Sequence, residues 1–205
     1  MANIKLTKNE LKNQKDKLKQ FERYLPTLQL KKQQLQSVIT SIEAELEEKS
    51  AERAAMIGDL DDWIDVFSEN TLFDGEKKLE NLIVPESVVV GTDNIAGVTI
   101  PIFRDLTFKE ISYDVADYPL WVDMALIKLR EIARLDALVK TLNTQVELLG
   151  KELRSTSQRV NLFEKVKIPE AKENIRVINI YIGDQQTSAV VRGKIAKKKR
   201  MEVAQ

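Results

Sequence analysis

Four aspartates, Asp59, Asp61, Asp62 and Asp65, are the residues of this 205-residue chain whose type and spacing come closest to chemistry. Clustered carboxylates can bind a divalent cation or act as general acid and base. On a helix, however, this spacing distributes the side chains around the cylinder, and no oxygen-rich loop accompanies them. The pattern therefore favours a solvated acidic helix face over a metal or catalytic site.

The residue types that most enzymes use are missing from the chain. It contains no histidine and no cysteine, which excludes Ser-His and Cys-His catalysis, thiolate zinc sites and disulfides. Its seven glycines form neither a Gly-x-Gly-x-x-Gly loop nor a Gly-x-x-x-x-Gly-Lys-Ser/Thr loop for phosphates. We predict no catalytic residue, no cofactor-binding residue and no metal ligand, and therefore a protein that is not an enzyme.

Charge is balanced overall but unevenly distributed. The 32 basic and 32 acidic residues cancel, so the chain has no global field for nucleic acid or an anionic membrane. No stretch has the roughly 18 to 20 uncharged apolar residues of a membrane span, and we expect a soluble chain. Residues 43–52 and 59–65 are rich in carboxylates, whereas lysines cluster near both ends, at Lys5, Lys8, Lys12, Lys15, Lys17 and Lys19 and at Lys194, Lys197, Lys198, Lys199 and Arg200.

The N-terminal arm has the apolar spacing of a coiled coil. Alternating steps of three and four visit Leu11, Gln14, Leu18, Phe21, Leu25, Leu28, Lys32, Leu35, Ile39, Ile42 and Leu46. We extend this line through Ser50, Arg53, Ile57, Leu60, Ile64 and Phe67, and we expect looser packing over residues 47–55, where it becomes hydrophilic. Pro26 removes one helical hydrogen bond, so we expect a bend near Tyr24 but no end to the helix.

The C-terminal arm repeats the pattern more cleanly. The apolar line passes through Leu135, Val139, Leu142, Val146, Leu149, Leu153, Thr156, Val160 and Phe163. It then slips by one residue at Ile168-Pro169 and resumes through Ala171, Ile175, Ile178 and Ile182, which predicts a second kink. Neither arm can bury its apolar line alone, so we expect the two to pair antiparallel in a left-handed supercoil. That pairing would bring both basic ends to one tip.

Between the arms the helical period disappears and β-branched residues take over. Val88-Val89-Val90 and Val98-Thr99-Ile100-Pro101-Ile102 predict a short β-hairpin with its turn at Gly91-Thr92-Asp93-Asn94. Pro85 and Pro101 cannot donate to a strand ladder, so both should lie at edges or strand ends. We expect a small core where the insert meets the arms, made of Phe103, Leu106, Phe108, Ile111, Tyr113, Tyr118 and Trp121 with Trp63, Phe67, Leu72 and Phe73.

The predicted fold is mainly α, a long two-helix coiled coil with a short hairpin-containing insert. We divide it into an N-terminal coiled-coil helix over residues 5–75, a β-hairpin insert over residues 76–118 and a C-terminal coiled-coil helix over residues 119–205.

Two segments resemble a known family, the central-stalk D subunits of V/A-type rotary ATPases and ATP synthases. Residues 158–169, Gln-Arg-Val-Asn-Leu-Phe-Glu-Lys-Val-Lys-Ile-Pro, are similar to the family's Arg-Val-Asn-Ala-Leu-Glu-x-Val-x-Ile-Pro stretch. Residues 94–103, Asn-Ile-Ala-Gly-Val-Thr-Ile-Pro-Ile-Phe, are similar to its Asn-x-Ala-Gly-Val-x-x-Pro hairpin. Residues 28–32 and 184–187 depart from the family pattern, which indicates a divergent, bacterial branch.

The resemblance implies a non-catalytic rotor shaft that couples proton or sodium flow through a membrane ring to ATP synthesis or hydrolysis. It implies three partners: a hexamer of A and B subunits at residues 1–25 and 185–205, the small F subunit at residues 86–103 with the neighbouring helix, and the socket subunit of the membrane ring at residues 59–74 and 113–123. It places the chain in the cytoplasm, peripheral to the inner membrane, with no cofactor, no nucleic acid and no membrane insertion of its own.

Three other interpretations are considered beside the resemblance. An enzyme in its own right would require ATP turnover by the purified chain, and we predict none. A structural coiled-coil adaptor would show the same arms without a rotary role, and it would not co-purify with A, B and F subunits. A nucleic-acid or membrane-surface binder would use the lysine-rich tip, and the isolated chain would bind DNA or anionic vesicles in a salt-sensitive way.

Overall fold

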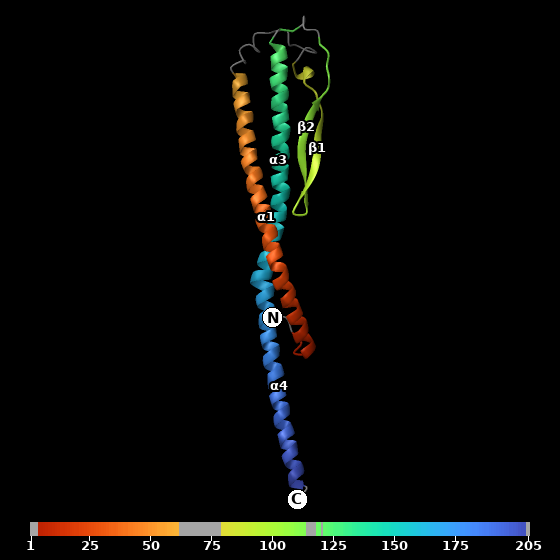
Figure 1. Cartoon of the computed structure of the whole chain (residues 1–205), viewed down its shortest axis with the longest axis vertical. Helices are drawn as coiled ribbons and strands as arrows, with labels where there is room; N and C mark the ends of the chain where they lie inside the picture. The colour runs from red at the N-terminus through yellow and green to blue at the C-terminus, as the bar shows by residue number, and fades with distance from the viewer. Residues whose placement is uncertain (1–3, 62–78, 114–117, 120, 204–205) are drawn as a thin grey trace. The chain divides into compact units, whose positions relative to one another are not determined.

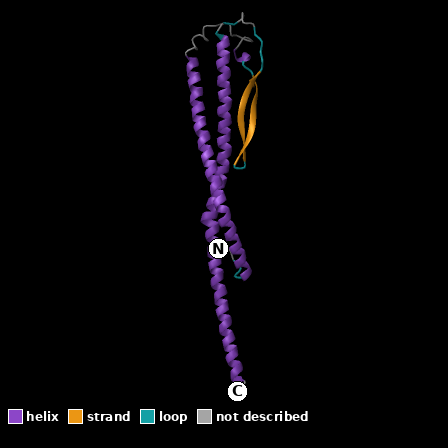
Figure 2. Cartoon of the chain, in the orientation of Figure 1, coloured by secondary structure: helices purple, strands orange, loops and turns teal. Residues whose placement is uncertain are grey.

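The computed structural model describes residues 4–61, 79–113, 118–119 and 121–203. Its elements are helix α1 (Lys8–Asp61), a short 3-10 helix η2 (Leu79–Leu82), strands β1 (Pro85–Ile95) and β2 (Val98–Phe108), helix α3 (Val122–Leu162), a π-helical turn η4 (Phe163–Lys167) and helix α4 (Ile168–Val203). The protein is thus mainly helical, with long helices flanking a two-stranded hairpin, as predicted (Figures 1 and 2). The predicted boundary at residue 75 lies outside the described residues.

The chain forms two compact units, residues 33–154 and residues 1–32 with 155–205. In the unit of residues 33–154, the second half of α1 lies antiparallel beside α3 and the hairpin lies beside α3 (Figure 1). Ion pairs of Arg53 with Asp136, and of Lys128 with Asp59 at 4.0 Å, set this direction. The core is formed by Leu35, Ile39 and Ile42 of α1, Leu142 and Leu149 of α3, and Ile100 of β2. These helical positions all belong to the predicted apolar lines.

Past Leu46 the buried line of α1 differs from the predicted one. Ser50 is exposed and Ile57 is 36% exposed, whereas Lys49, Arg53, Met56 and Leu60 are half-buried. The predicted line moved by four residues from Ile42 to Leu46 and by four again to Ser50. A 3.5-residue period alternates steps of three and four, so the step after Leu46 should be three, to Lys49. No side chain between residues 43 and 60 is fully buried, so the expected loose packing of this stretch is confirmed.

In the other unit, the first part of α1 packs against the end of α3 and against α4. The rings of Phe21 and Phe163 stack with centroids 5.3 Å apart, and the Lys172 Nζ lies 3.5 Å from a carboxylate oxygen of Glu22. Thr156, Val160, Ala171 and Ile178 are buried here. Helix α1 continues through Pro26 as predicted, and the bend near Tyr24 stays a prediction.

The predicted one-residue slip in the C-terminal arm has a structural cause. Residues Phe163–Lys167 form a π-helical turn in which the Ile168 N–H donates to the Phe163 carbonyl, five residues back. A π turn holds one more residue than an α turn, so the apolar line resumes one position later, at Ala171 and Ile178. The π turn ends at Lys167, two residues before Pro169, whose ring would clash with the carbonyl of Lys165 in a regular helix.

The hairpin is longer than predicted, with eleven residues in each strand, and its turn lies elsewhere. Ile95 pairs with Val98, so the loop is Ala96-Gly97, with φ of 51° and 83°. Two positive φ values are those of a type I′ turn, whose twist matches that of the strands. The Gly97 N–H donates to the Asn94 Oδ1 at 3.0 Å, which anchors the turn at this position.

The predicted turn at residues 91–94 is therefore wrong, because these residues continue β1. At Gly91 an added Cβ would lie 2.8 Å from the Arg104 Nε, so the flexible Arg104 side chain would have to shift to accommodate it. Arg104 is the extra residue of a bulge, since Val90 pairs with Phe103 and Val89 with Asp105. Both prolines lie on edge strands, as every strand of a two-stranded sheet is an edge.

The small core predicted at the insert is confirmed in part. Ile111, Tyr113, Tyr118 and Trp121 pack against a buried cluster formed by Leu82, Val122 and Leu126. Leu106 is buried, but it lies outside this cluster, and Phe108 contacts arginines of α3 instead. Trp63, Phe67, Leu72 and Phe73 lie outside the described residues, as does Ile64 of the extended N-terminal line.

Candidate partner-binding surfaces

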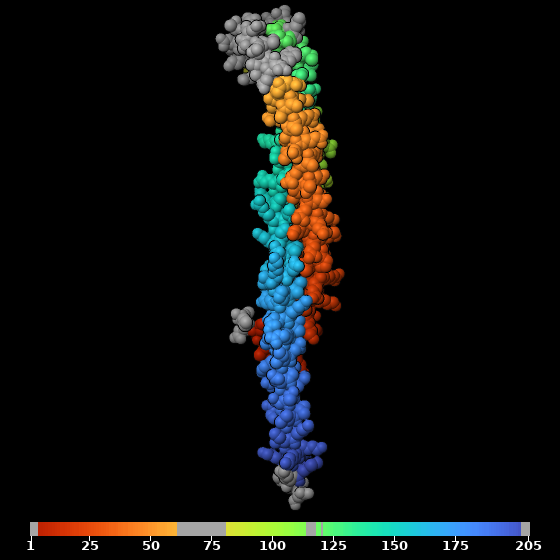
Figure 3. Space-filling view, turned by 90° about the vertical axis from the view of Figure 1, so that its left-hand side faces the viewer, coloured from red at the N-terminus to blue at the C-terminus, as the bar shows by residue number. Residues whose placement is uncertain are grey.

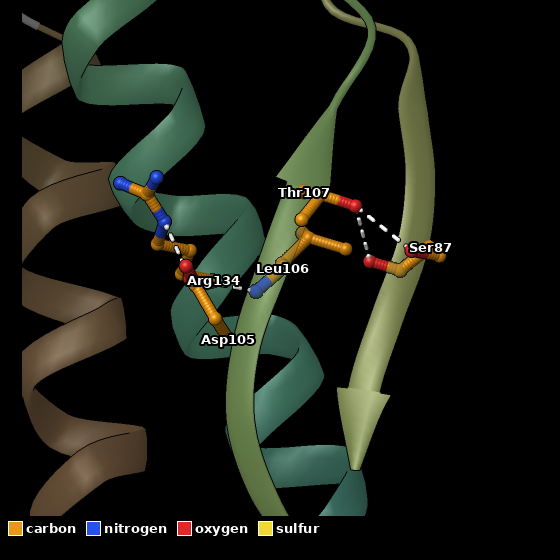
Figure 4. A network of polar contacts seen from close by, with 5 residues as sticks. All are labelled: Ser87, Asp105, Leu106, Thr107 and Arg134. Carbon is orange, nitrogen blue, oxygen red and sulfur yellow. Dashed lines mark hydrogen bonds and ion pairs between the residues drawn. The ribbon is translucent and has the colours of Figure 1, made fainter.

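The hairpin is fixed to α3 by one apolar face and by polar contacts at two levels. Ile100 and Leu106 are buried from β2, and the buried Gln145 donates from Nε2 to the Pro101 carbonyl at 2.6 Å. Nearer the open end of the hairpin, Arg134 of α3 pairs with Asp105 at 3.2 Å (Figure 4). The hairpin is therefore positioned by the helix.

The two strands are also joined by side chains. The hydroxyls of Ser87 and Thr107 lie 2.8 Å apart, and the Thr107 hydroxyl donates to the Ser87 carbonyl at 3.1 Å (Figure 4). Cross-strand hydroxyl pairs of this kind stabilise a hairpin that has no third strand.

The rest of the hairpin offers apolar surface to a partner. Val88, Val89 and Val90 are 47%, 40% and 52% exposed, and Ile102 is 38% exposed. A groove of about 500 Å³ runs between the hairpin and α3, lined largely by apolar atoms of Pro85, Val88, Pro101, Leu106, Ala133 and Ala137. An open strand edge beside exposed β-branched side chains is a typical protein-binding surface.

The last part of α4 is a second exposed surface. Every residue from Gly183 to Met201 is exposed, including the lysine run that begins at Lys194. In the space-filling view the end of α4 has no other segment against it (Figure 3). A long helix that buries nothing in its own unit presents all of its faces to a partner.

The expectation that both lysine runs meet at one tip is wrong. Asn174 of α4 donates to the Gln14 Oε1 of α1 at 3.4 Å, so these two residues lie level with each other. In an antiparallel pair, Lys8 then lies level with about residue 180, and at 1.5 Å per residue Lys194 lies about 20 Å further along α4. The prediction assumed arms of equal reach, whereas α4 continues well past the start of α1.

Two described residues of the segment predicted to face the socket subunit, Tyr113 and Asp123, are joined by a hydrogen bond. The Tyr113 hydroxyl donates to the Asp123 Oδ1, and its ring packs edge-on against Tyr118, with centroids 5.4 Å apart. The hydrogen bond to Asp123, reinforced by burial, raises the pKa of the Tyr113 hydroxyl. Of the acidic region predicted beside it, residues 62–74 lie outside the described residues.

The described residues include no group of three or more Asp or Glu side chains placed to hold a metal ion. Asp59 is engaged by Lys128 instead, and Asp62 and Asp65 are not among the described residues. None of the described helices has a stretch apolar enough, over sufficient length, to cross a membrane.

One cluster was missed by sequence reasoning. The guanidinium carbons of Arg130 and Arg134 lie 5.8 and 5.6 Å from the centroid of the Phe108 ring, an arrangement that we call the arginine stack. The four-residue spacing of the two arginines on α3 was a visible signal that they share a face. The position of Phe108 beside them could not be predicted from the sequence, because it depends on how the hairpin folds back along the helix.

Comparisons with known proteins match nearly the whole chain. A family model that describes the D subunit of ATP synthase matches residues 10–198. A protein named as the D subunit of V-type ATP synthase from Borreliella burgdorferi is 52% identical, covering 96% of this chain and 95% of that protein. Proteins of the same name from Chlamydia caviae and Chlamydia felis are 35% and 34% identical, each covering 97% of this chain and 94% of its own length.

Proposed function

Because the chain belongs to the family of ATP synthase D subunits, we propose that it is the central-stalk subunit, a non-catalytic rotor shaft, of a V/A-type ATP synthase or ATPase. It would couple proton or sodium flow through a membrane ring to ATP synthesis or hydrolysis in a hexamer of A and B subunits. Rotation of an asymmetric shaft would change which catalytic interface of the hexamer is open.

The observation that carries this proposal is similarity over nearly the whole chain. A relative with 52% identity over 96% of the chain supports a shared role for nearly all of it. The exposed helix from Gly183 to Met201 supports it as well, since such a helix requires a partner to bury its apolar side chains.

We assign partners by segment within this proposal. Residues 1–25 and 185–205 would contact the hexamer, which the exposure and positive charge of the lysine runs support. Residues 86–103 with α3 would hold the small F subunit, which the exposed valines and the groove support. Residues 59–74 and 113–123 would face the socket subunit. The complex would lie on the cytoplasmic side of the inner membrane, with this chain peripheral to it.

Reconstitution tests the proposal. A and B subunits with the F and socket subunits and the membrane ring are assembled with and without this chain, and ATP turnover and ion transport are measured together. We expect ion transport to be lost without the chain, even where the hexamer still hydrolyses ATP. Normal coupled transport in its absence would show that the chain is not the shaft. A coiled-coil adaptor would fail to co-purify with A, B and F subunits.

A further inference from the structure

The arginine stack brings two guanidinium groups against one aromatic ring. Phe108 ends β2, and Arg130 and Arg134 lie one turn apart on α3, with both guanidinium groups close to its ring. Cation–π attraction holds the two groups against the ring, but it uses none of their N–H donors. The N–H groups of both arginines must therefore be paired with water or with an acceptor on a protein.

Among the described residues, an acceptor is in place for one of the two arginines. Arg134 pairs with Asp105, as Figure 4 shows. The Nε of Arg130 is buried and has no hydrogen-bond partner within the part of the chain that the structure describes. A buried donor without an acceptor bears its desolvation penalty uncompensated, and such groups are rare in native proteins.

Two carboxylates on this part of the chain, Asp105 and Asp123, already accept hydrogen bonds from other groups. Asp105 accepts from Arg134 and also from the Leu106 N–H at 2.8 Å. Asp123 accepts from the Tyr113 hydroxyl. The described part of the chain thus holds the Arg130 guanidinium against a ring without supplying its Nε with a carboxylate.

Exposed apolar side chains adjoin the stack on the same helix. Met124 is 52% exposed and Ile127 is 51% exposed. Ile127 precedes Arg130 by three residues and Arg134 by seven, which places all three on neighbouring positions of one helix face. The surface therefore combines planar cationic groups with apolar side chains.

We propose that the arginine stack, together with Met124 and Ile127, docks an acidic and partly apolar segment of a protein partner, one of whose carboxylates binds the guanidinium of Arg130. Arginine binds carboxylates through paired N–H donors and is enriched at the centres of protein interfaces. Asp105, Asp123 and Glu131 on the same part of the chain disfavour a polyanion such as nucleic acid or an anionic membrane, because several negative charges would repel it more than a single carboxylate.

The test uses the assembly of the proposed function, on which this inference rests. Arg130→Gln, Arg130→Lys and Arg134→Gln variants are assembled with the co-expressed partner subunits, and exchange against labelled wild-type chain is timed. Arg154→Gln is the matched control, because Arg154 is an exposed arginine of the same helix. Circular dichroism of each free variant verifies that it folds.

We expect Arg130→Gln to exchange about tenfold faster than the wild type, as for loss of one interface anchor, and Arg130→Lys to be intermediate because it keeps the charge without the paired donors. Arg154→Gln should match the wild type. Equal exchange of Arg130→Gln and Arg154→Gln would overturn the docking proposal alone. Failure of the wild-type chain to enter the assembly would instead overturn the proposed function.

A photo-crosslinking residue at Ile127 identifies the occupant in the same assembly. We expect a cross-link to a protein segment that carries Asp or Glu beside apolar residues. Substitution of that carboxylate by the neutral amide should reproduce the exchange rate of Arg130→Gln and add nothing in combination with it. A cross-link to lipid or nucleic acid, or to a segment without carboxylates, would contradict the proposal.

Discussion

At the scale of single residues, the Tyr113–Asp123 hydrogen bond makes stability depend on pH in the alkaline range. The folded state raises the pKa of the Tyr113 hydroxyl, so the stabilisation is fully present below the unfolded value of about 10 and is lost as pH rises through the higher folded value. Tyr113→Phe should therefore cost about 0.5–1 kcal/mol near neutral pH and progressively less above about pH 10. Urea unfolding across this range measures the difference.

Tyr24→Phe is the control for this prediction, because Tyr24 is 59% exposed on α1. It should leave the pH profile of unfolding unchanged. A constant stability difference between wild type and Tyr113→Phe at all pH values would show that the hydroxyl does not titrate differently in the folded state.

Two glycines should respond to alanine with opposite sign. Gly97 has a φ of 83°, where a Cβ is strained, so Gly97→Ala should destabilise the hairpin by about 1–2 kcal/mol. Gly150 lies inside α3 with no atom within 4 Å of an added Cβ, so Gly150→Ala should stabilise by about 0.5–1 kcal/mol. Thermal unfolding measures both, and a stabilising Gly97→Ala would refute the turn assignment.

At the scale of elements, the π turn predicts which one-residue deletions the chain tolerates. Deleting Val166 should convert the turn to regular α-helix and leave Ala171 and Ile178 in the buried line, with a change below about 1 kcal/mol. Deleting Glu173 should rotate Ile178, which is fully buried, away from its partners and cost about 2–4 kcal/mol. Denaturant unfolding compares the two, and equal losses would contradict this role of the π turn.

The same elements show what sequence could and could not predict. Leu35, Leu149 and Ile178 each lie on an apolar line of regular spacing, so local pattern alone placed them in the core. The slip before Ala171 indicated an irregularity in the helix, but the prediction was a kink at Pro169 and not the π turn that the structure shows. The hairpin turn was misplaced because residues 91–94 have turn-like composition, whereas the Asn94 contact with Gly97 decides the register. Contacts between hairpin and helix, such as Gln145 with Pro101, follow from tertiary packing that no local pattern encodes.

At the scale of the whole molecule, we expect the exposed end of α4 to contribute to partner binding but little to the stability of the free chain. Residues from Gly183 to Met201 bury nothing, so truncation after Gly183 should change the thermal midpoint of the free chain by no more than about 2 °C while lowering its helical signal. In the proposed rotor the same truncation should weaken binding to the A/B hexamer by at least about tenfold, because this helix supplies contact area that only a partner can bury. Replacing Lys197, Lys198, Lys199 and Arg200 with glutamine keeps the helix and tests charge separately. A midpoint lowered by more than about 5 °C would mean that the segment stabilises the free chain, and unchanged hexamer binding would remove it from the interface.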